Sequence, residues 1–466
     1  MAGTGETDPT LHQDGGAAAA ASSDPPQKAE LDAGALFVLE SKGSWVHCGY
    51  HLTTSIVAPP LLSLPFALTL LGWAGGIVSL VVAALVTFYS YNLLSLVLEH
   101  QAAMGRRQLR FRDMANQILG PRWGRYYVGP VQFMVCYGAV VACILLGGQC
   151  MKAIYVLSKP DGTLKLYVFV TIFGCFMLIL AQIPSFHSLR HINLVSLLLC
   201  LAYSACATAA AVHIGSSSSS SSSQPKEYSL PGDSTQDRLF GIFNAIAIIG
   251  TTYGNGIIPE IQATVAAPVK GKMFKGLCIC YAVILATFFS VGVSGYWAFG
   301  NRADGLVLSN FVDNGRPLVP KWFVLMTNVF TILQLSAVAV VYLQPTNEVL
   351  EGTFADPRSK QFSVRNVVPR VVSRSLSVVV ATVVAAMLPF FGDINALIGA
   401  FGFIPLDFIL PVVFYNLTFK PSKRSIVFWL NSTIAIVFSA IGAISAVAAV
   451  RQMSLDAKTY RLFANV

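Results

Sequence analysis

Two long apolar segments contain residues that cannot continue an α-helix, and these interruptions limit most what the chain can fold into. One segment carries three glycines and a proline within Gly250–Pro259, and the first apolar segment carries Pro59-Pro60, which lack a backbone N–H. An unpaired backbone group in hydrocarbon costs several kcal/mol, so a break is tolerated only inside protein or beside a wet cavity. Two such breaks predict a binding site between them.

The composition places these segments in a membrane. Hydrophobic residues make up 55% of the chain and charged residues only 11%, which predicts an all-α polytopic membrane protein. Eleven apolar runs are long enough to cross a bilayer. They lie near 46–67, 73–98, 126–153, 166–183, 189–214, 239–260, 274–299, 322–345, 367–388, 394–416 and 425–450.

The basic residues predict the orientation. With the N-terminus inside, nineteen Lys and Arg fall in inner connections and ten in outer ones, which favours a cytosolic N-terminus and an outside C-terminus. The inner group lies at 28–42, 106–125, 190, 270–275, 358–370 and 420–424. The net charge of +9 therefore reflects topology, and no nucleic-acid partner is expected. Membrane lipids are the expected surroundings.

The order of the breaks predicts the domain organisation. Residues 1–40 are polar and Ala-rich and read as a disordered cytosolic tail, followed by a transporter core over 41–416. A Ser-rich outer loop at 215–238 separates a first group of five spans, about 46–214, from a second, about 239–416. Each group opens with a broken helix. Residues 417–466 add an eleventh span and a short outer tail.

Several segments resemble the amino acid/auxin permease family, and most closely its plant branch of proton-coupled GABA transporters. They are LTTSIVAPPLLSLPFALTLLGWAGG (52–76), FRDMANQILGPRWGRYYVGP (111–130), TTYGNGIIPEIQATVAAPVKGKM (251–273), GYWAFG (295–300) and FFGDINALIGAFGFIPLDFILPVVFYN (390–416). The resemblance implies the five-plus-five inverted repeat of the leucine-transporter type, within the APC superfamily. It also implies proton-driven amino acid uptake, usually at the plasma membrane.

The function that follows is import of small zwitterionic amino acids, including GABA and related ω-amino acids, by proton symport with alternating access. A broader amino acid or auxin symporter, or a sensor or channel on the same scaffold, is the alternative. Relatives have Gly-His where this chain has Gly254-Asn255, and many have Gly-Ser-Gly where it has Ala58-Pro59-Pro60. We expect these departures to affect substrate preference.

A zwitterion needs partners for both of its charges. The helix that begins after Pro60 offers its positive end to the carboxylate, and the carbonyl end near Ile249–Gly250 suits the ammonium. The expected substrate contacts are Ala58, Pro60, the free N–H groups of Leu61, Leu62 and Ser63, and Tyr137, Gly250, Thr251, Thr252, Tyr253, Gly254 and Asn255. The alternative is that Gly254 and Gly256 merely permit close helix packing.

Glu260 and His51 are the candidates for proton coupling. An acid within a span is a functional candidate by default, although Glu260 also suits a structural role in bridging the inner half-helix. His51 titrates near neutral pH when unperturbed, but a helical His is more often a packed hydrogen-bond donor. No cofactor and no metal site are expected; the proton gradient supplies the energy, and sodium coupling is not excluded.

Asp393 and Asp407 raise the alternative of an intramembrane aspartyl protease. Fourteen residues of helix separate them by ~21 Å, too far for one catalytic dyad, and the first lacks a Gly-x-Gly-Asp pattern. Asp393 is expected at the outer mouth of its span and Asp407 as a satisfied acid in the inner half. An enzyme is not expected.

Overall fold

The computed structural model describes residues 43–183, 190–217, 226–232, 234–266, 269–313, 315–354, 356 and 363–459. Within them the fold is helical apart from one short hairpin of β1 (Val312–Asp313) and β2 (Arg316–Pro317). The tail at 1–40, most of the Ser-rich run, and the last residues of the chain lie outside the described residues, so those predictions stay predictions.

The helices follow the predicted order. In the first half they are α2 (Trp45–Ile56), the 3-10 helix η1 (Pro59–Ser63), α3 (Leu64–Ala103), α4 (Phe111–Leu119), α5 (Pro121–Trp123), the π-helical η2 (Gly124–Val128), α6 (Gly129–Ser158), α7 (Leu166–Leu180) and α8 (Arg190–Ser216). In the second half they are α9 (Thr235–Tyr253), α10 (Ile258–Ala263), α11 (Lys272–Phe299), the 3-10 turns η4 (Gly300–Arg302) and η5 (Val307–Phe311), α12 (Lys321–Phe354), α13 (Val364–Met387), α14 (Phe391–Ile398), the π-helical η6 (Gly399–Ile409), α15 (Leu410–Phe419) and α16 (Ile426–Thr459).

The number of spans agrees with the prediction of about eleven. Nine stretches within the described residues are long and apolar enough to cross a membrane, and the first of them, Pro59–Ala103, holds the end of one span, which begins with α2, and the whole of the next. Gly72 divides it, because its φ of 69° and ψ of 176° interrupt α3 where the sequence predicted a boundary between 67 and 73. With α7, which is apolar but shorter, the total is eleven.

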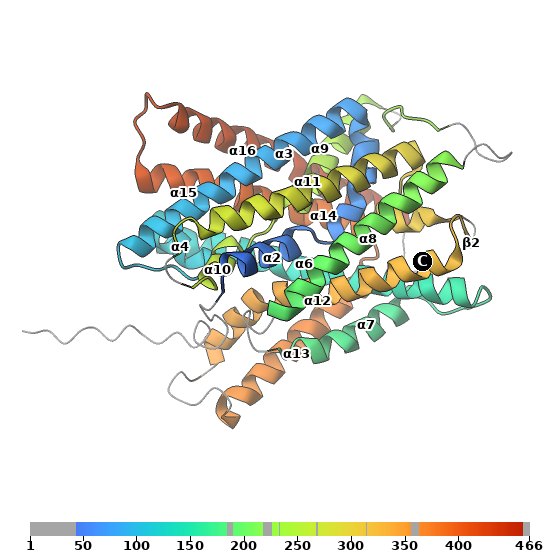
Figure 1. Ribbon diagram of the computed structural model, residues 1–466, viewed down its shortest axis with the longest axis horizontal. Helices are drawn as coiled ribbons and strands as arrows, with labels where there is room; N and C mark the ends of the chain where they lie inside the picture. The colour runs from blue at the N-terminus through green and yellow to red at the C-terminus, as the bar shows by residue number, and fades with distance from the viewer. Residues whose placement is uncertain are drawn as a thin grey trace, which may run out of the picture.

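The two interrupted helices lie inside the bundle. Figure 1 shows the short blue α2 between the long α11 and α8, with α10 at its end, and α2 packs against both long helices. The outer faces carry the apolar side chains that the composition predicts for contact with lipid: Val364, Leu376, Ile426 and Ile436 are each more than 60% exposed.

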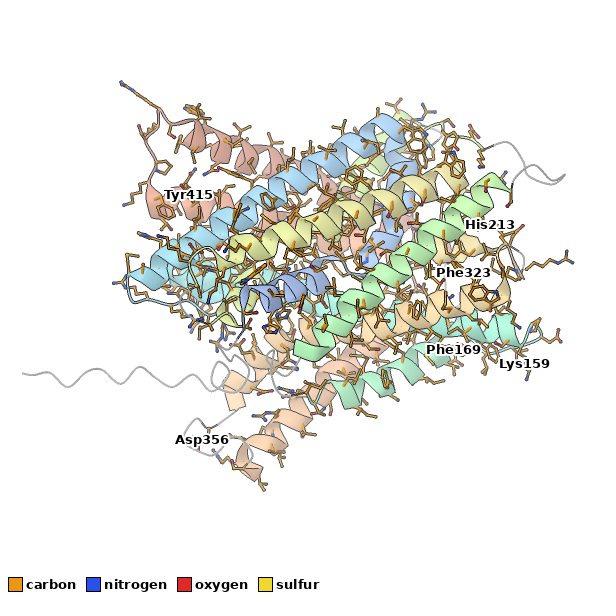
Figure 2. All side chains as sticks on the ribbon, viewed as in Figure 1. Lys159, Phe169, His213, Phe323, Asp356 and Tyr415 are labelled. Atoms are coloured by element: carbon orange, nitrogen blue, oxygen red, sulfur yellow. The ribbon has the colours of Figure 1, made fainter. Side chains whose placement is uncertain are left out.

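The connections alternate between two ends of the bundle, as the span count requires. Figure 2 shows Lys159, His213 and Phe323 at one end, where α6 and α8 finish and α12 begins. Asp356 and Tyr415 lie toward the other end, where α12 and α15 finish. The first set was assigned to the outer side and the second to the inner side by the distribution of Lys and Arg.

Buried charges join the helices at the end of the bundle where α12 finishes. Glu351 of α12 accepts from Arg370 Nε at 3.2 Å and from Arg374 Nε at 2.6 Å, both of α13. Arg110, just before α4, pairs with Glu348 one turn earlier on α12. Removing one partner of such a buried pair costs about 3–5 kcal/mol. These pairs therefore fix α4 and α13 against α12.

The helix α4, which follows the second span, is amphipathic. Its Phe111, Met114 and Ala115 are buried, while Gln117 on the opposite side is exposed. Two asparagines join the last two spans: Asn431 Nδ2, on α16, donates to Asn416 Oδ1, on α15, at 2.8 Å.

Candidate functional site

The first break lies between α2 and η1. Val57 and Ala58 leave helical geometry, with ψ angles of 65° and 167°, and the two prolines that follow cannot donate to the preceding turn. The hydroxyl of Tyr342, on α12, donates to the freed carbonyl of Ser55 at 3.0 Å. A side chain from a distant helix therefore satisfies the carbonyl end of this break.

The second break lies between α9 and α10. Gly254 is extended, and Gly256 has a φ of +65°, a conformation that only glycine adopts at little cost. The carboxylate of Asp407, on η6, accepts from the backbone N–H of Asn255 at 3.0 Å and of Gly256 at 3.1 Å. Asp407 replaces the partners that a continuous helix would have supplied, as its predicted role of a satisfied acid requires.

The two breaks contact each other. Asn255 Nδ2 donates to Ser55 Oγ at 2.7 Å, and both residues are fully buried. Thr252 Oγ1 lies 3.5 Å from the carbonyl oxygen of Pro60 and donates to Ile248 at 2.9 Å. The two interruptions thus form one polar region in the interior of the bundle.

A pocket opens beside this region. The breaks, α6, α12 and the α14–η6 segment enclose it, through Ser55, Ala58, Pro59, Pro60, Ala139, Ala142, Cys143, Thr251, Gly254, Val338, Tyr342, Phe391, Asn395, Ile398 and Phe403. The volume open to water-sized spheres is about 30 Å³, enough for one or two ordered waters. Because this volume is so small, a molecule of several heavy atoms enters only if helices or side chains move.

The polar lining carries no charge. Ser55, Thr251, Tyr342 and Asn395 supply hydroxyl and amide groups, and none of the described residues that line the pocket is acidic or basic. Thr251 Oγ1 donates to the carbonyl of Asn395, and Asn395 Oδ1 is buried without a partner among the described residues. Charged groups of a ligand must therefore be met by helix ends and neutral dipoles.

The predicted contact residues fall into two groups. Ala58, Pro60, Thr251 and Gly254 line the pocket. The others do not line it. Thr252 and Asn255 join the two breaks, Gly250 packs on Ile404, and the Tyr253 ring lies 4.9 Å from that of Phe288. Leu61 and Leu62 are buried in the core, and the Ser63 hydroxyl donates to the carbonyl of Gly305 at 2.6 Å.

Two details of the prediction were wrong. The N–H of Leu61 is not free, because it donates to the carbonyl of Ala58 at 3.1 Å in the 3-10 turn. The helix before the second break ends at Tyr253 and not near Ile249–Gly250, since Thr251–Tyr253 keep helical geometry until Gly254. The carbonyl end consequently sits one turn further along the chain.

Tyr137 does not reach the pocket. Its hydroxyl donates to the carbonyl of Ser377, on α13, at 2.8 Å, and its ring stacks on Phe133 at 5.7 Å. It lines a separate apolar groove between α6, α12 and α13. The prediction placed the residue on the correct helix but on the wrong face.

Glu260 stands at the start of α10 and bridges three elements. Its Oε1 accepts from the N–H of Phe111, at the start of α4, at 3.0 Å and from Gln132 Nε2, on α6, at 2.7 Å. The same Gln132 nitrogen donates to the carbonyl of Gly256 at 3.1 Å. Glu260 Oε2 is buried with no hydrogen-bond partner in the described part of the chain.

His51 is buried on α2, one turn before Thr54. It does not line the pocket at the breaks.

Sequence reasoning missed most of the pocket lining, including Tyr342, Asn395 and Phe403, and it missed the capping role of Asp407. Tyr342 lies in an uninterrupted helix and carries no local signal. The other three fall within the quoted stretch 390–416, where α14 passes into a π-helical segment. Within that apolar run, the polar side chains of Asn395 and Asp407 were the only signal of a functional role.

The comparisons with known proteins agree with this architecture. The profile described as "Transmembrane amino acid transporter protein" matches residues 41–455. GABA transporter 1 of Arabidopsis thaliana is 64% identical over 438 residues, which cover 94% of this chain and 96% of that protein. Lysine histidine transporter-like 1 of the same plant is 26% identical over 443 residues, 94% of each chain.

One solved structure shows the fold. Mhp1, a nucleobase-cation-symport-1 family transporter in a closed conformation with bromovinylhydantoin bound, aligns with a TM-score of 0.51 and 14% identity over 92% of this chain and 96% of that chain. This likeness confirms the predicted fold, and at this identity it says nothing of the substrate. The profile match and the 64% identity show that the chain belongs to the transmembrane amino acid transporter family.

Proposed function

We propose that this membrane protein imports GABA and related small zwitterionic amino acids by proton symport with alternating access. The observation that carries the proposal is the uncharged polar pocket between two broken helices, in a chain 64% identical to a protein named GABA transporter 1. The pocket suits a molecule whose own charges sum to zero, because burying it adds no net charge, and the helix ends and neutral dipoles can meet each of its two charges.

The two ends of the substrate take different positions. Its carboxylate lies toward the start of η1 at Ala58–Pro60, and its ammonium lies toward the carbonyl end of α9 at Thr251. Asn395 supplies its partnerless Oδ1 to the ammonium, and the Tyr342 hydroxyl lies beside the first break. Pro59 and Pro60 withhold N–H groups, which makes the carboxylate end less selective for α-amino acids.

The proton travels through Glu260 in this proposal. The support is its place: it binds Gln132, which in turn binds the carbonyl of Gly256 at the second break. Protonation of a carboxylate alters the hydrogen bonds that it accepts, so it can loosen the contact between α10 and α6. His51 is the second candidate, since it lies on the half-helix that precedes the first break.

The cellular placement is part of the proposal. The N-terminus is cytosolic, the C-terminus is outside, and the membrane is the plasma membrane. An epitope added after Val466 is then reached by antibody in intact cells, whereas one added before Met1 is reached only after permeabilisation. The reverse pattern would contradict the orientation.

An uptake panel in proteoliposomes tests the function. The purified protein is reconstituted, a pH gradient is imposed, and accumulation of radiolabelled GABA, proline, lysine and auxin is compared, with sodium replaced by choline in a parallel series. We expect GABA to accumulate above equilibrium without sodium and an uncoupler to abolish the accumulation. Dependence on sodium would refute proton coupling, and equilibration without accumulation would indicate a channel.

A further inference from the structure

A second pocket, the α4 pocket, lies between α4, η2, α6 and α12, away from the pocket at the breaks. It has a volume of about 600 Å³. Among its lining residues Asn116, Arg125 and Pro130 are exposed, whereas Gln132 and Pro345 are buried. Figure 1 shows α4 at the end of the bundle where α12 finishes. The exposed residues therefore form a mouth at that end, and the buried ones form the floor.

Gln132 connects the floor of the α4 pocket to Glu260. Its Nε2 donates to Glu260 Oε1 at 2.7 Å and to the carbonyl of Gly256, in the second break, at 3.1 Å. The other carboxylate oxygen, Oε2, is buried and has no hydrogen-bond partner among the residues that the structure describes. Burying such an oxygen without a partner is costly, and ordered water commonly supplies the missing hydrogen bond. One glutamine side chain thus separates a buried acid from an open cavity.

The floor of the α4 pocket offers polar groups to water. Pro345 has no N–H, so the carbonyl of Val341, one turn earlier on α12, receives no helical hydrogen bond from it. The Gln132 amide adds a donor and an acceptor beside this carbonyl. A buried water molecule needs several polar partners and room for one water, and the α4 pocket supplies both.

The groups around Glu260 leave its protonation to water. Asp113 of α4 and Cys136 of α6 act on it electrostatically. Of the other charged groups on this side of the bundle, Glu99 of α3 accepts from the backbone at the start of α11, and Arg110 pairs with α12. The two groups that donate to Glu260 are neutral amides, from α4 and α6. Access to water therefore decides how readily Glu260 exchanges its proton.

We propose that the α4 pocket is the water-filled route by which a proton passes between Glu260 and the solution at this end of the bundle. The carboxylic acid gives its proton to a water molecule in the pocket, and the carboxylate that remains accepts the hydrogen bond from Gln132. Gln132 is a positioning residue, because the same amide holds the carbonyl of Gly256 and so ties the second break to the state of the acid. This inference rests on the proposed role of Glu260 in proton symport.

Thiol labelling in proteoliposomes tests whether water reaches the floor. Gln132→Cys is treated on both sides of the membrane with a charged methanethiosulfonate reagent, and the labelled peptide is measured by mass spectrometry. Val135→Cys, fully buried on the same helix, and Leu376→Cys, 61% exposed in the apolar groove, are the controls. We expect labelling of Gln132→Cys and none of the two controls. An unlabelled Gln132→Cys, or equal labelling of all three variants, would overturn the proposal.

Infrared spectroscopy follows the Glu260 carboxyl group with Gln132 intact. Its carboxylic acid C=O band, measured at acid pH, is the one missing from Glu260→Gln, and transfer to D₂O shifts it. Val349→Trp fills the α4 pocket, whereas Val364→Trp adds the same ring at a 78% exposed position outside it. We expect the shift to slow several-fold only in Val349→Trp; equal rates in the two variants would overturn the route.

Both measurements are independent of transport. If Glu260→Gln still accumulates GABA under a pH gradient while the Glu260 band exchanges through the α4 pocket, the symport role of Glu260 fails and the route stands. If labelling and exchange both ignore the pocket while Glu260→Gln loses accumulation, the symport role stands and the route is wrong.

Discussion

Removing the carboxylate of Asp407 should release the second helix break. The side chain is fully buried and accepts two backbone N–H groups, from Asn255 at 3.0 Å and from Gly256 at 3.1 Å. Asp407→Ala leaves both donors buried without an acceptor. Each such group costs about 1–3 kcal/mol, so the variant should lose about 2–6 kcal/mol of stability. That is a large fraction of a typical folding free energy.

Asp407→Asn is the matched comparison. Oδ2 lies 3.0 Å from the N–H of Asn255 and 3.2 Å from that of Gly256, so one amide oxygen at that position can serve both donors. We expect Asp407→Asn to retain most of the stability and measurable GABA uptake. Asp161→Ala, at an exposed position, should match the unmodified protein.

The assay is thermal unfolding of the purified protein in detergent, followed by uptake in proteoliposomes. We expect the unmodified protein to have the highest midpoint of thermal unfolding, Asp407→Asn a lower one and Asp407→Ala by far the lowest. Only Asp407→Ala should lose uptake. Normal melting and normal uptake by Asp407→Ala would refute the view that this carboxylate holds the break. Equal damage in both variants would show that charge, and not hydrogen-bond acceptance, is what matters.

Four further predictions concern the pocket. Gly254→Ala places a methyl group against the aromatic ring of η6 and should abolish uptake, whereas Gly241→Ala, which has ordinary contacts, should not. Pro60→Gly adds a backbone donor and should shift preference from γ- toward α-amino acids; an unchanged substrate profile refutes this. Glu260→Gln should permit GABA exchange but not pH-driven accumulation, and normal accumulation would remove Glu260 from coupling. Tyr342→Phe deletes one hydrogen bond at the first break, worth about 1 kcal/mol, and should lower the apparent GABA affinity about fivefold in an uptake titration; unchanged affinity contradicts its role.

The fold was largely predictable because its signals are local. Apolar length predicted the spans, and the prolines and glycines predicted where two of them break, since these residues act through their own backbone geometry. Gly72 likewise separates two spans at the boundary that the apolar runs predicted. Such effects need no knowledge of distant contacts.

The partners of the breaks were not predictable in the same way. Tyr342 reaches the carbonyl of Ser55, 287 positions earlier in the chain, and Asn255 reaches Ser55 across 200 positions. These contacts depend on how helices pack, which one sequence does not specify. Tyr137 shows the same difficulty: its helix lines the pocket, but a rotation about the helix axis decides whether a side chain faces the pocket or the groove.

A density map of the full chain in a lipid nanodisc with GABA bound tests the central claim most directly. We expect density for one small molecule between the first break at Ser55–Pro60 and the second at Thr251–Gly254, with both helices interrupted and the pocket enlarged around it. Two continuous helices, or GABA bound at a site that contacts neither break, would contradict the account.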